Sequence, residues 1–275
     1  MLSLSLLVFL GCSSIQEASN KDTSDDVLIE VSTFSPKAFL LQEQASTIFG
    51  VLPDSMPGST NDTPERIALG KKLYFDKALS LNDAQSCNSC HDLINGRMGV
   101  NHKSISIITK EERGRRNAPT SINAGLHVAQ FWDGRASDLK AQLKEHLVNI
   151  GDSMPNEEAL INKLSGIAGY PAMFRAAFPE QNQVVTYDNL AEAIAAFERT
   201  LISRDRFDTF QKGSLTALND QELRGLEIFM DTGCITCHNG PTVGGSSYQK
   251  VGVMVQYFPE DTKDIGRAAI SGNDA

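Results

Sequence analysis

Apolar side chains recur every three or four residues over much of the chain, which is the spacing of helices that bury one face. The stripe within 190–201 is the clearest, and we interpret it as core. Pro64 suits the first turn of a helix, and Asn219 with Glu222 matches a capping box. No alternating strand pattern exceeds a few residues, so the predicted fold class is mainly α. The predicted helices start at Pro64, carry the first cysteine pair, cover 139–147, 157–164, 171–178 and 187–202, and resume after Asn219.

The segments between these helices suggest the domain organisation. Residues 95–120 hold Gly, Asn, Lys and Arg without periodicity, and loops of this length in compact domains are usually functional. Residues 203–215 look like an interdomain connection. We therefore expect two domains, at 61–205 and 206–275, preceded by a tether and N-terminal extension at 13–60.

An apolar run at 2–11 precedes Cys12 and is too short to span a bilayer as a helix. It reads as the apolar region of an export signal, so residues 1–12 are interpreted as a lipoprotein-type signal. Residues 9–12 resemble a bacterial lipobox, which would place a lipid on Cys12 and anchor the protein to a membrane. The alternative is an ordinary secretory signal in which Cys12 is incidental. Either interpretation predicts an exported, periplasmic protein.

Composition narrows the classes of macromolecule that the protein is expected to bind. The 275 residues are 41% hydrophobic and 21% charged, as in globular proteins, and the formal net charge is −9. Nucleic acid binding needs clustered Lys and Arg, so the acidic balance argues against it. A basic protein partner, such as a small cationic redox protein, fits better.

Four of the five cysteines lie in two Cys-x-x-Cys-His motifs, the attachment signature of c-type haem. Two thiols three positions apart on a helical turn can bond to one porphyrin edge, and the adjacent His can ligate iron. A zinc ribbon would place its pairs close together, whereas 234 − 87 = 147 residues separate these. A thioredoxin-like pair needs a βαβ context, and a disulfide leaves the histidines unexplained. We expect two covalently bound haems, on Cys87, Cys90 and His91 and on Cys234, Cys237 and His238.

Haem propionates need basic counter-charges. The candidates are Arg113, Arg115 and Arg116 in the long loop, and Arg135. The alternative for each is a solvated basic patch.

Several further segments match one family. The segment 69–76 reads LGKKLYFD, 116–120 reads RNAPT, 130–136 reads QFWDGRA and 193–201 reads AIAAFERTL. With the two haem motifs, they resemble the bacterial di-haem cytochrome c peroxidases and the related oxidases of methylamine utilisation, from about Thr63 to the C-terminus. The resemblance implies two cytochrome c-like domains, the second of them incomplete in this chain.

The resemblance also implies roles for individual residues. The haem on His91 would be the low-potential site where peroxide binds, and the haem on His238 would accept electrons from a small donor protein. Trp132 matches a family tryptophan between the haems that assists electron transfer; a large buried anchor is the plainer interpretation and is compatible with it. Asn117 matches a ligand of a calcium ion, which needs six to eight oxygens in all.

At the peroxide site the chain departs from the family. In many members a distal His blocks the iron. In this chain that position falls on Thr109, which predicts an open site. The alternative is that His102 reaches the iron. Gln142 matches a family Gln near the peroxide. The family Glu falls near Asp152, which could relay protons or cap a turn. His146 lies one helical turn after Gln142 and could face the same pocket; a surface position is the plainer interpretation.

The predicted function is reduction of hydrogen peroxide to water with electrons from a small periplasmic cytochrome c or copper protein. The alternatives are an oxidase of the methylamine-utilisation type that acts on a partner protein, and a di-haem electron carrier without turnover. Only 275 − 238 = 37 residues follow His238, so the sixth ligand of the second haem is expected beyond Ala275. Family members are commonly dimers, which predicts a homodimer.

Overall fold

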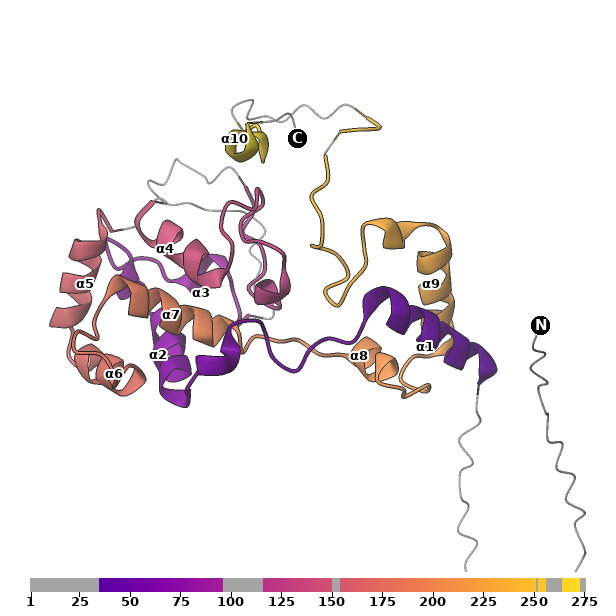
Figure 1. Cartoon of the computed structure of the whole chain (residues 1–275), viewed down its shortest axis with the longest axis horizontal. Helices are drawn as coiled ribbons and strands as arrows, with labels where there is room; N and C mark the ends of the chain where they lie inside the picture. The colour runs from indigo at the N-terminus through magenta and orange to yellow at the C-terminus, as the bar shows by residue number, and fades with distance from the viewer. Residues whose placement is uncertain (1–34, 96–115, 150–153, 251, 256–263, 273–275) are drawn as a thin grey trace, which may run out of the picture. The chain divides into compact units, whose positions relative to one another are not determined.

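The computed structural model describes residues 35–95, 116–149, 154–250, 252–255 and 264–272 (Figure 1). These residues form helices, short 3-10 turns and loops, with an isolated β-bridge between Gln130 and Ala136, a further bridge residue at Ser80, and no longer strand. The mainly α prediction is confirmed. The α-helices are α1 (Pro36–Phe49), α2 (Pro64–Phe75), α3 (Cys87–Cys90), α4 (Leu139–Asn149), α5 (Glu157–Gly166), α6 (Tyr170–Ala177), α7 (Tyr187–Glu198), α8 (Arg206–Gln211), α9 (Asp220–Asp231) and α10 (Ala268–Ser271); the 3-10 turns are η1 (Ser59–Asn61), η2 (Lys77–Leu79), η3 (Ala124–Leu126) and η4 (Cys234–Thr236).

The first hydrophobic core forms around the crossing of α2 and α7, with α4, α5 and α6 packed beside them (Figure 1). The two central helices approach closely at Gly70, where an added Cβ would lie 1.8 Å from the Ala193 carbonyl oxygen. Only glycine permits this approach. Tyr74 is fully buried between Phe75 and Phe197, with ring centroids 5.2 Å from each. This core supports α3, which follows α2 in the chain.

A second hydrophobic core joins α1 to α8 and α9, which lie side by side in Figure 1. Phe49 from α1 contacts Phe207 from α8 and Phe229 from α9, with ring centroids 5.5 and 6.3 Å away. Phe210 is fully buried in the same cluster. Residues 36–49, which the sequence places in the N-terminal extension, thus contribute to the core that precedes the second cysteine pair.

The predicted helices are present with shifted ends. Thr63 caps α2, its hydroxyl accepting from the Arg66 amide, and the capping box of Asn219 and Glu222 opens α9 as predicted. Helix α7 ends at Glu198 rather than at residue 202. Residues 203–215, expected to form an interdomain connection, contain the helix α8. Six mostly polar residues are too few to show a helical period.

Several predictions fall on residues outside those described: the lipidated Cys12, the loop residues His102, Thr109, Arg113 and Arg115, and Asp152. Among the residues that are described, none belongs to a helix long and apolar enough to cross a bilayer.

Candidate haem sites

The first Cys-x-x-Cys-His motif forms a single closed helical turn. Helix α3 covers Cys87–Cys90, and the amide of His91 donates to the carbonyl of Cys87 at 2.8 Å. Residues three apart on such a turn share one side, as two thioether bonds to one porphyrin edge require.

The second motif repeats this turn on a different core. The 3-10 turn η4 covers Cys234–Thr236, and the amide of His238 donates to the carbonyl of Cys234 at 2.9 Å. Gly233 starts the turn at φ 86°, in the left-handed region that favours glycine. The ring of Phe229, from α9, packs edge-on against the His238 imidazole with centroids 6.0 Å apart.

Both histidines are oriented in the same way. The Nδ1 of His91 donates to the backbone carbonyl of Pro119 at 2.7 Å, and the Nδ1 of His238 donates to that of Val243 at 3.1 Å. A carbonyl can only accept, so the proton lies on Nδ1 and Nε2 is the nitrogen available to a metal. This is the arrangement typical of histidines that ligate iron. The donor set therefore fits haem at both motifs.

Neighbouring side chains hold the backbone of the first motif. The hydroxyl of Tyr74 donates to the carbonyl of His91 at 2.8 Å and lies 3.1 Å from the Ser121 hydroxyl. Burial raises the pKa of Tyr74, so it stays a neutral donor. The buried carboxylate of Asp92 accepts from the amides of Ile94 and Asn95 at 3.0 and 3.1 Å. The chain on both sides of the imidazole is thus fixed by the protein.

The thiols of the first pair are not tuned for redox exchange. Burial raises the pKa of Cys87 to about 12, with the nearby Glu198 adding to the effect, and burial also raises the pKa of Cys90. A reactive pair of the thioredoxin type needs a lowered thiol pKa. Across the described part of the chain, no three His, Cys, Asp or Glu side chains are grouped to hold a metal ion by themselves. The raised thiol pKa values disfavour the redox-pair alternative.

Trp132 lies in a loop closed by the bridge between Gln130 and Ala136. Its Nε1 donates to the backbone carbonyl of Asn117 at 2.7 Å, and its side chain is 63% exposed. The described residues leave most of the ring uncovered, and its role in electron transfer stays a prediction. Asn117 is also exposed, and its role as a calcium ligand stays a prediction.

Helix α4 carries Gln142 and His146, both partly buried. The interpretation of His146 as a surface residue was wrong. Burial lowers the pKa of His146 to about 4, with the charge of Arg135, and that of His91 whenever it is doubly protonated, adding to the effect, so the imidazole is neutral at pH 7. His146 thus lies on the same helix as Gln142, the predicted peroxide-site residue.

Two of the arginines predicted to balance the haem propionates, Arg116 and Arg135, lie among the described residues. Both of them pair with carboxylates of the chain. Arg116 donates to Asp133 at 2.7 Å and, through two nitrogens, to Asp264. Arg135 donates to Asp133 at 2.9 Å and to Glu145 at 2.5 Å. Its guanidinium lies 3.4 Å from the ring centroid of Phe131. Neither arginine belongs to a merely solvated patch.

Sequence reasoning missed two features of the site. One is that the Pro119 and Val243 carbonyls accept hydrogen bonds from the two motif histidines, because residue identity does not reveal what a backbone atom bonds to. For Pro119, the matched segment 116–120 is the only signal in the sequence. The other is Glu198, whose side chain is buried while its Oε2 makes no hydrogen bond.

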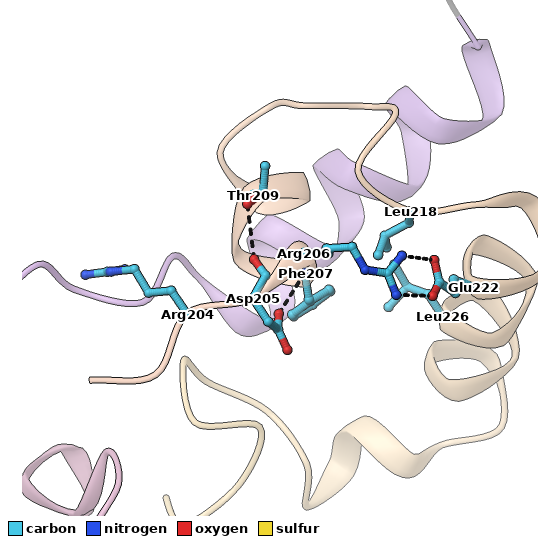
Figure 2. A pocket seen from close by; sticks show the side chains of 8 residues that line it. All are labelled: Arg204, Asp205, Arg206, Phe207, Thr209, Leu218, Glu222 and Leu226. Atoms are coloured by element: carbon cyan, nitrogen blue, oxygen red, sulfur yellow. Dashed lines mark hydrogen bonds and ion pairs between the residues drawn. The ribbon is translucent and has the colours of Figure 1, made fainter. Parts of the chain in front are cut away.

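A cavity of about 750 Å³ lies apart from both motifs in sequence (Figure 2). Arg206 and Glu222 lie side by side in its lining, joined by two hydrogen bonds of 2.7 and 2.5 Å. None of its lining residues is a cysteine or histidine of either motif; they are Arg204, Asp205, Arg206, Phe207, Thr209, Leu218, Glu222 and Leu226.

A helical fold with two matched Cys-x-x-Cys-His turns defines a haem-binding protein, and comparison with known proteins specifies which kind. The family described as di-haem cytochrome c peroxidase matches residues 64–216. This chain belongs to that family, and haem is the family's cofactor.

The names of individual relatives agree with this family assignment. Cytochrome c551 peroxidase of Nitrosomonas europaea is 41% identical over 219 residues, covering 78% of this chain and 64% of the relative. The protein of the same name from Pseudomonas aeruginosa is 38% identical over 231 residues, covering 83% and 66%. The chain thus spans slightly less than two thirds of these relatives. A crystal structure of a MauG-like protein associated with microbial copper homeostasis aligns with TM-score 0.66 at 25% identity, covering 81% of this chain and 69% of the other.

Proposed function

We propose that this protein is a peroxidase that reduces hydrogen peroxide to water with electrons from a small cytochrome c or cupredoxin in the periplasm. The observation that carries the proposal is the pair of matched turns, in which His91 and His238 both hold Nδ1 on a backbone carbonyl. The cytochrome c551 peroxidases, 41% and 38% identical, support it.

Covalent attachment follows from the same turns. Cys87 and Cys90 would hold one haem and Cys234 and Cys237 the other, with His91 and His238 as iron ligands. When bound, haem supplies the redox chemistry needed to cleave the peroxide O–O bond. The protein contributes the fixed imidazoles and the surrounding hydrogen bonds.

Around the first haem we assign positioning and proton-handling roles. Gln142 would orient peroxide by hydrogen bonding, and Asp152 would hold and pass a proton. Thr109 would leave the iron position open, in preference to ligation by His102. Trp132, held by its bond to the Asn117 carbonyl, would lie on the electron path between the haems.

Other parts of the proposal concern the whole protein. The net charge of −9 would attract a basic electron donor. The proposal also includes a calcium ion bound in part by Asn117, a lipid on Cys12 and a homodimer. These features rest on the family resemblance and the lipobox pattern.

A second candidate is an oxidase that acts on a partner protein. It is favoured by the structural similarity to a MauG-like protein at TM-score 0.66. This enzyme would use peroxide only when a protein substrate is oxidised. A pure electron carrier would instead keep both irons six-coordinate and would not turn over peroxide.

The test is steady-state oxidation of a reduced small cytochrome c by hydrogen peroxide, using the full-length holo-protein. We expect Gln142→Ala to lower kcat/KM about 100-fold, the typical cost of losing one preorganised hydrogen bond. Glu180→Gln, which breaks only an exposed 3.0 Å ion pair with Arg66, is the control and should match wild type. Absence of turnover in wild type, or turnover only with an oxidisable partner protein, contradicts the peroxidase proposal.

A further inference from the structure

The segment 116–119 is held at three successive points. At its start, the Arg116 guanidinium binds carboxylates. Next, the carbonyl of Asn117 accepts from Trp132 Nε1 at 2.7 Å. At its end, the carbonyl of Pro119 accepts from His91 Nδ1 at 2.7 Å. These contacts tie the loop that carries Arg116 to the imidazole of the first motif through the Pro119 carbonyl.

The anchor for Arg116 comes from far along the chain. Asp264 accepts from Arg116 Nε at 2.6 Å and from a second guanidinium nitrogen, forming a two-pronged pair. Such pairs are stronger and more directional than single contacts. Both side chains are partly buried, so water screens them less than a surface pair. Asp264 itself is fixed, because its carboxylate also accepts from the Gly266 amide at 2.9 Å.

A second contact fastens the same C-terminal segment. Arg267 Nη1 donates to the carbonyl of Asp133 at 2.7 Å, and its guanidinium lies 4.0 Å from the ring centroid of Tyr248. Asp133 also binds Arg116 at 2.7 Å. The segment 264–267, which follows the second haem motif, is thus tied to the loop that supplies the acceptor for His91.

We propose that Asp264 is a positioning residue for the first haem: by holding Arg116, it fixes the Pro119 carbonyl against His91 Nδ1 and thereby sets the ligand strength of that imidazole. The inference rests on the proposed role of His91 as an iron ligand. A firm Nδ1–H···O bond makes the imidazole a stronger donor, which favours ferric iron and lowers the reduction potential. Because Asp264 follows the second haem motif, the arrangement lets the C-terminal segment tune the first haem.

The experiment compares wild type, Asp264→Asn and Asp264→Glu as holo-proteins by potentiometric titration and by resonance Raman spectroscopy of the ferrous state. Asp264→Asn should raise the potential of the first haem and lower its iron–histidine stretching frequency. The second haem is an internal control, because His238 bonds to Val243, outside this network. Asp264→Glu keeps the carboxylate, so it should give the wild-type reduction potential and the wild-type iron–histidine stretching frequency. Arg116→Lys, which keeps the charge but loses the two-pronged geometry, should shift the first haem in the same direction as Asp264→Asn.

Unchanged potentials in Asp264→Asn with two haems attached would overturn this inference alone. Equal shifts of both haems would also overturn it, since they would indicate a general loss of structure. A holo-protein without haem on Cys87 and Cys90 would overturn this inference together with the proposed function, so the two failures are distinguishable.

Discussion

At the scale of single residues, Glu198 is an ionisable group in an unfavourable place. Its side chain is 7% exposed at the end of α7, and Oε2 makes no hydrogen bond. Burial raises the pKa of Glu198 to about 8, although the adjacent Arg199 acts in the opposite direction. Arg199 itself is engaged by Asp62 at 2.6 Å and by Glu192 at 2.7 Å, so it gives Glu198 only partial compensation.

This environment predicts a pH-dependent stability. Between its ordinary pKa of 4.5 and about 8, Glu198 stays protonated in the folded state after the unfolded chain has released the proton. The free energy of unfolding should therefore fall as pH rises through this window. Replacing Glu198 with Gln removes the titration, so the variant should gain about 1–3 kcal/mol relative to wild type between pH 5 and pH 8. Denaturant titrations at several pH values measure the difference.

Glu180→Gln is the matched control, because Glu180 is exposed and forms only a surface pair. Its stability should follow that of wild type across the same range. If Glu198→Gln also shows the wild-type slope, Glu198 is already ionised in the folded protein and the interpretation fails.

The sequence identifies some functional residues better than others. The cysteines and histidines of both motifs are evident, because their spacing alone specifies a haem-binding turn. The Pro119 carbonyl is not evident, since a backbone oxygen acquires its role only from the fold. The environment of Glu198 depends on packing between α7 and its neighbours and is equally hidden in the sequence. The Arg116–Asp264 pair joins residues 148 positions apart, which no local pattern can indicate.

At the scale of elements, the crossing of α2 and α7 determines where the first motif lies. Gly70→Ala would place a Cβ 1.8 Å from the Ala193 carbonyl oxygen, and backbone cannot yield as a flexible side chain can. We expect the variant to lose about 1–3 kcal/mol of stability, as overpacked cores do, and to bind the first haem less completely. Thermal unfolding and haem content measure the two effects.

Gly225→Ala provides the matched control within another helix. Gly225 lies in α9 with no atom within 4 Å of an added Cβ. Because alanine favours helix over glycine, this variant should gain about 0.5–1 kcal/mol. Equal effects of the two substitutions would contradict the close approach of α2 and α7.

Most helices of the first core could be predicted from hydrophobic periodicity and caps, as α2 and α7 illustrate. The second core was harder to predict because it combines α1 with α8 and α9, from opposite ends of the chain. Helix α8 is short and largely polar in sequence, and its role depends on Phe210, which is buried by residues distant in the chain. Long-range packing of this kind leaves no periodic signal.

At the scale of the whole molecule, the two motifs predict two independent haem attachments. Replacing Cys87 and Cys90 with Ala should remove one covalently bound haem, and replacing Cys234 and Cys237 should remove the other, because the motifs lie against separate cores. Mass spectrometry of the denatured protein counts the haems directly. Wild type should carry two and each double variant one. A wild-type protein with fewer than two contradicts the assignment.

The central claim, that the first haem reacts with peroxide while the second transfers electrons, is tested most directly by EPR spectroscopy of the full-length holo-protein. Spectra are recorded in the resting and one-electron-reduced states, before and after hydrogen peroxide is added. We expect a high-spin signal from the haem on His91 in the resting state, which peroxide abolishes, and a second haem that changes only in oxidation state. Two low-spin haems in both states, with no peroxide consumed, would contradict the account and identify the protein as an electron carrier.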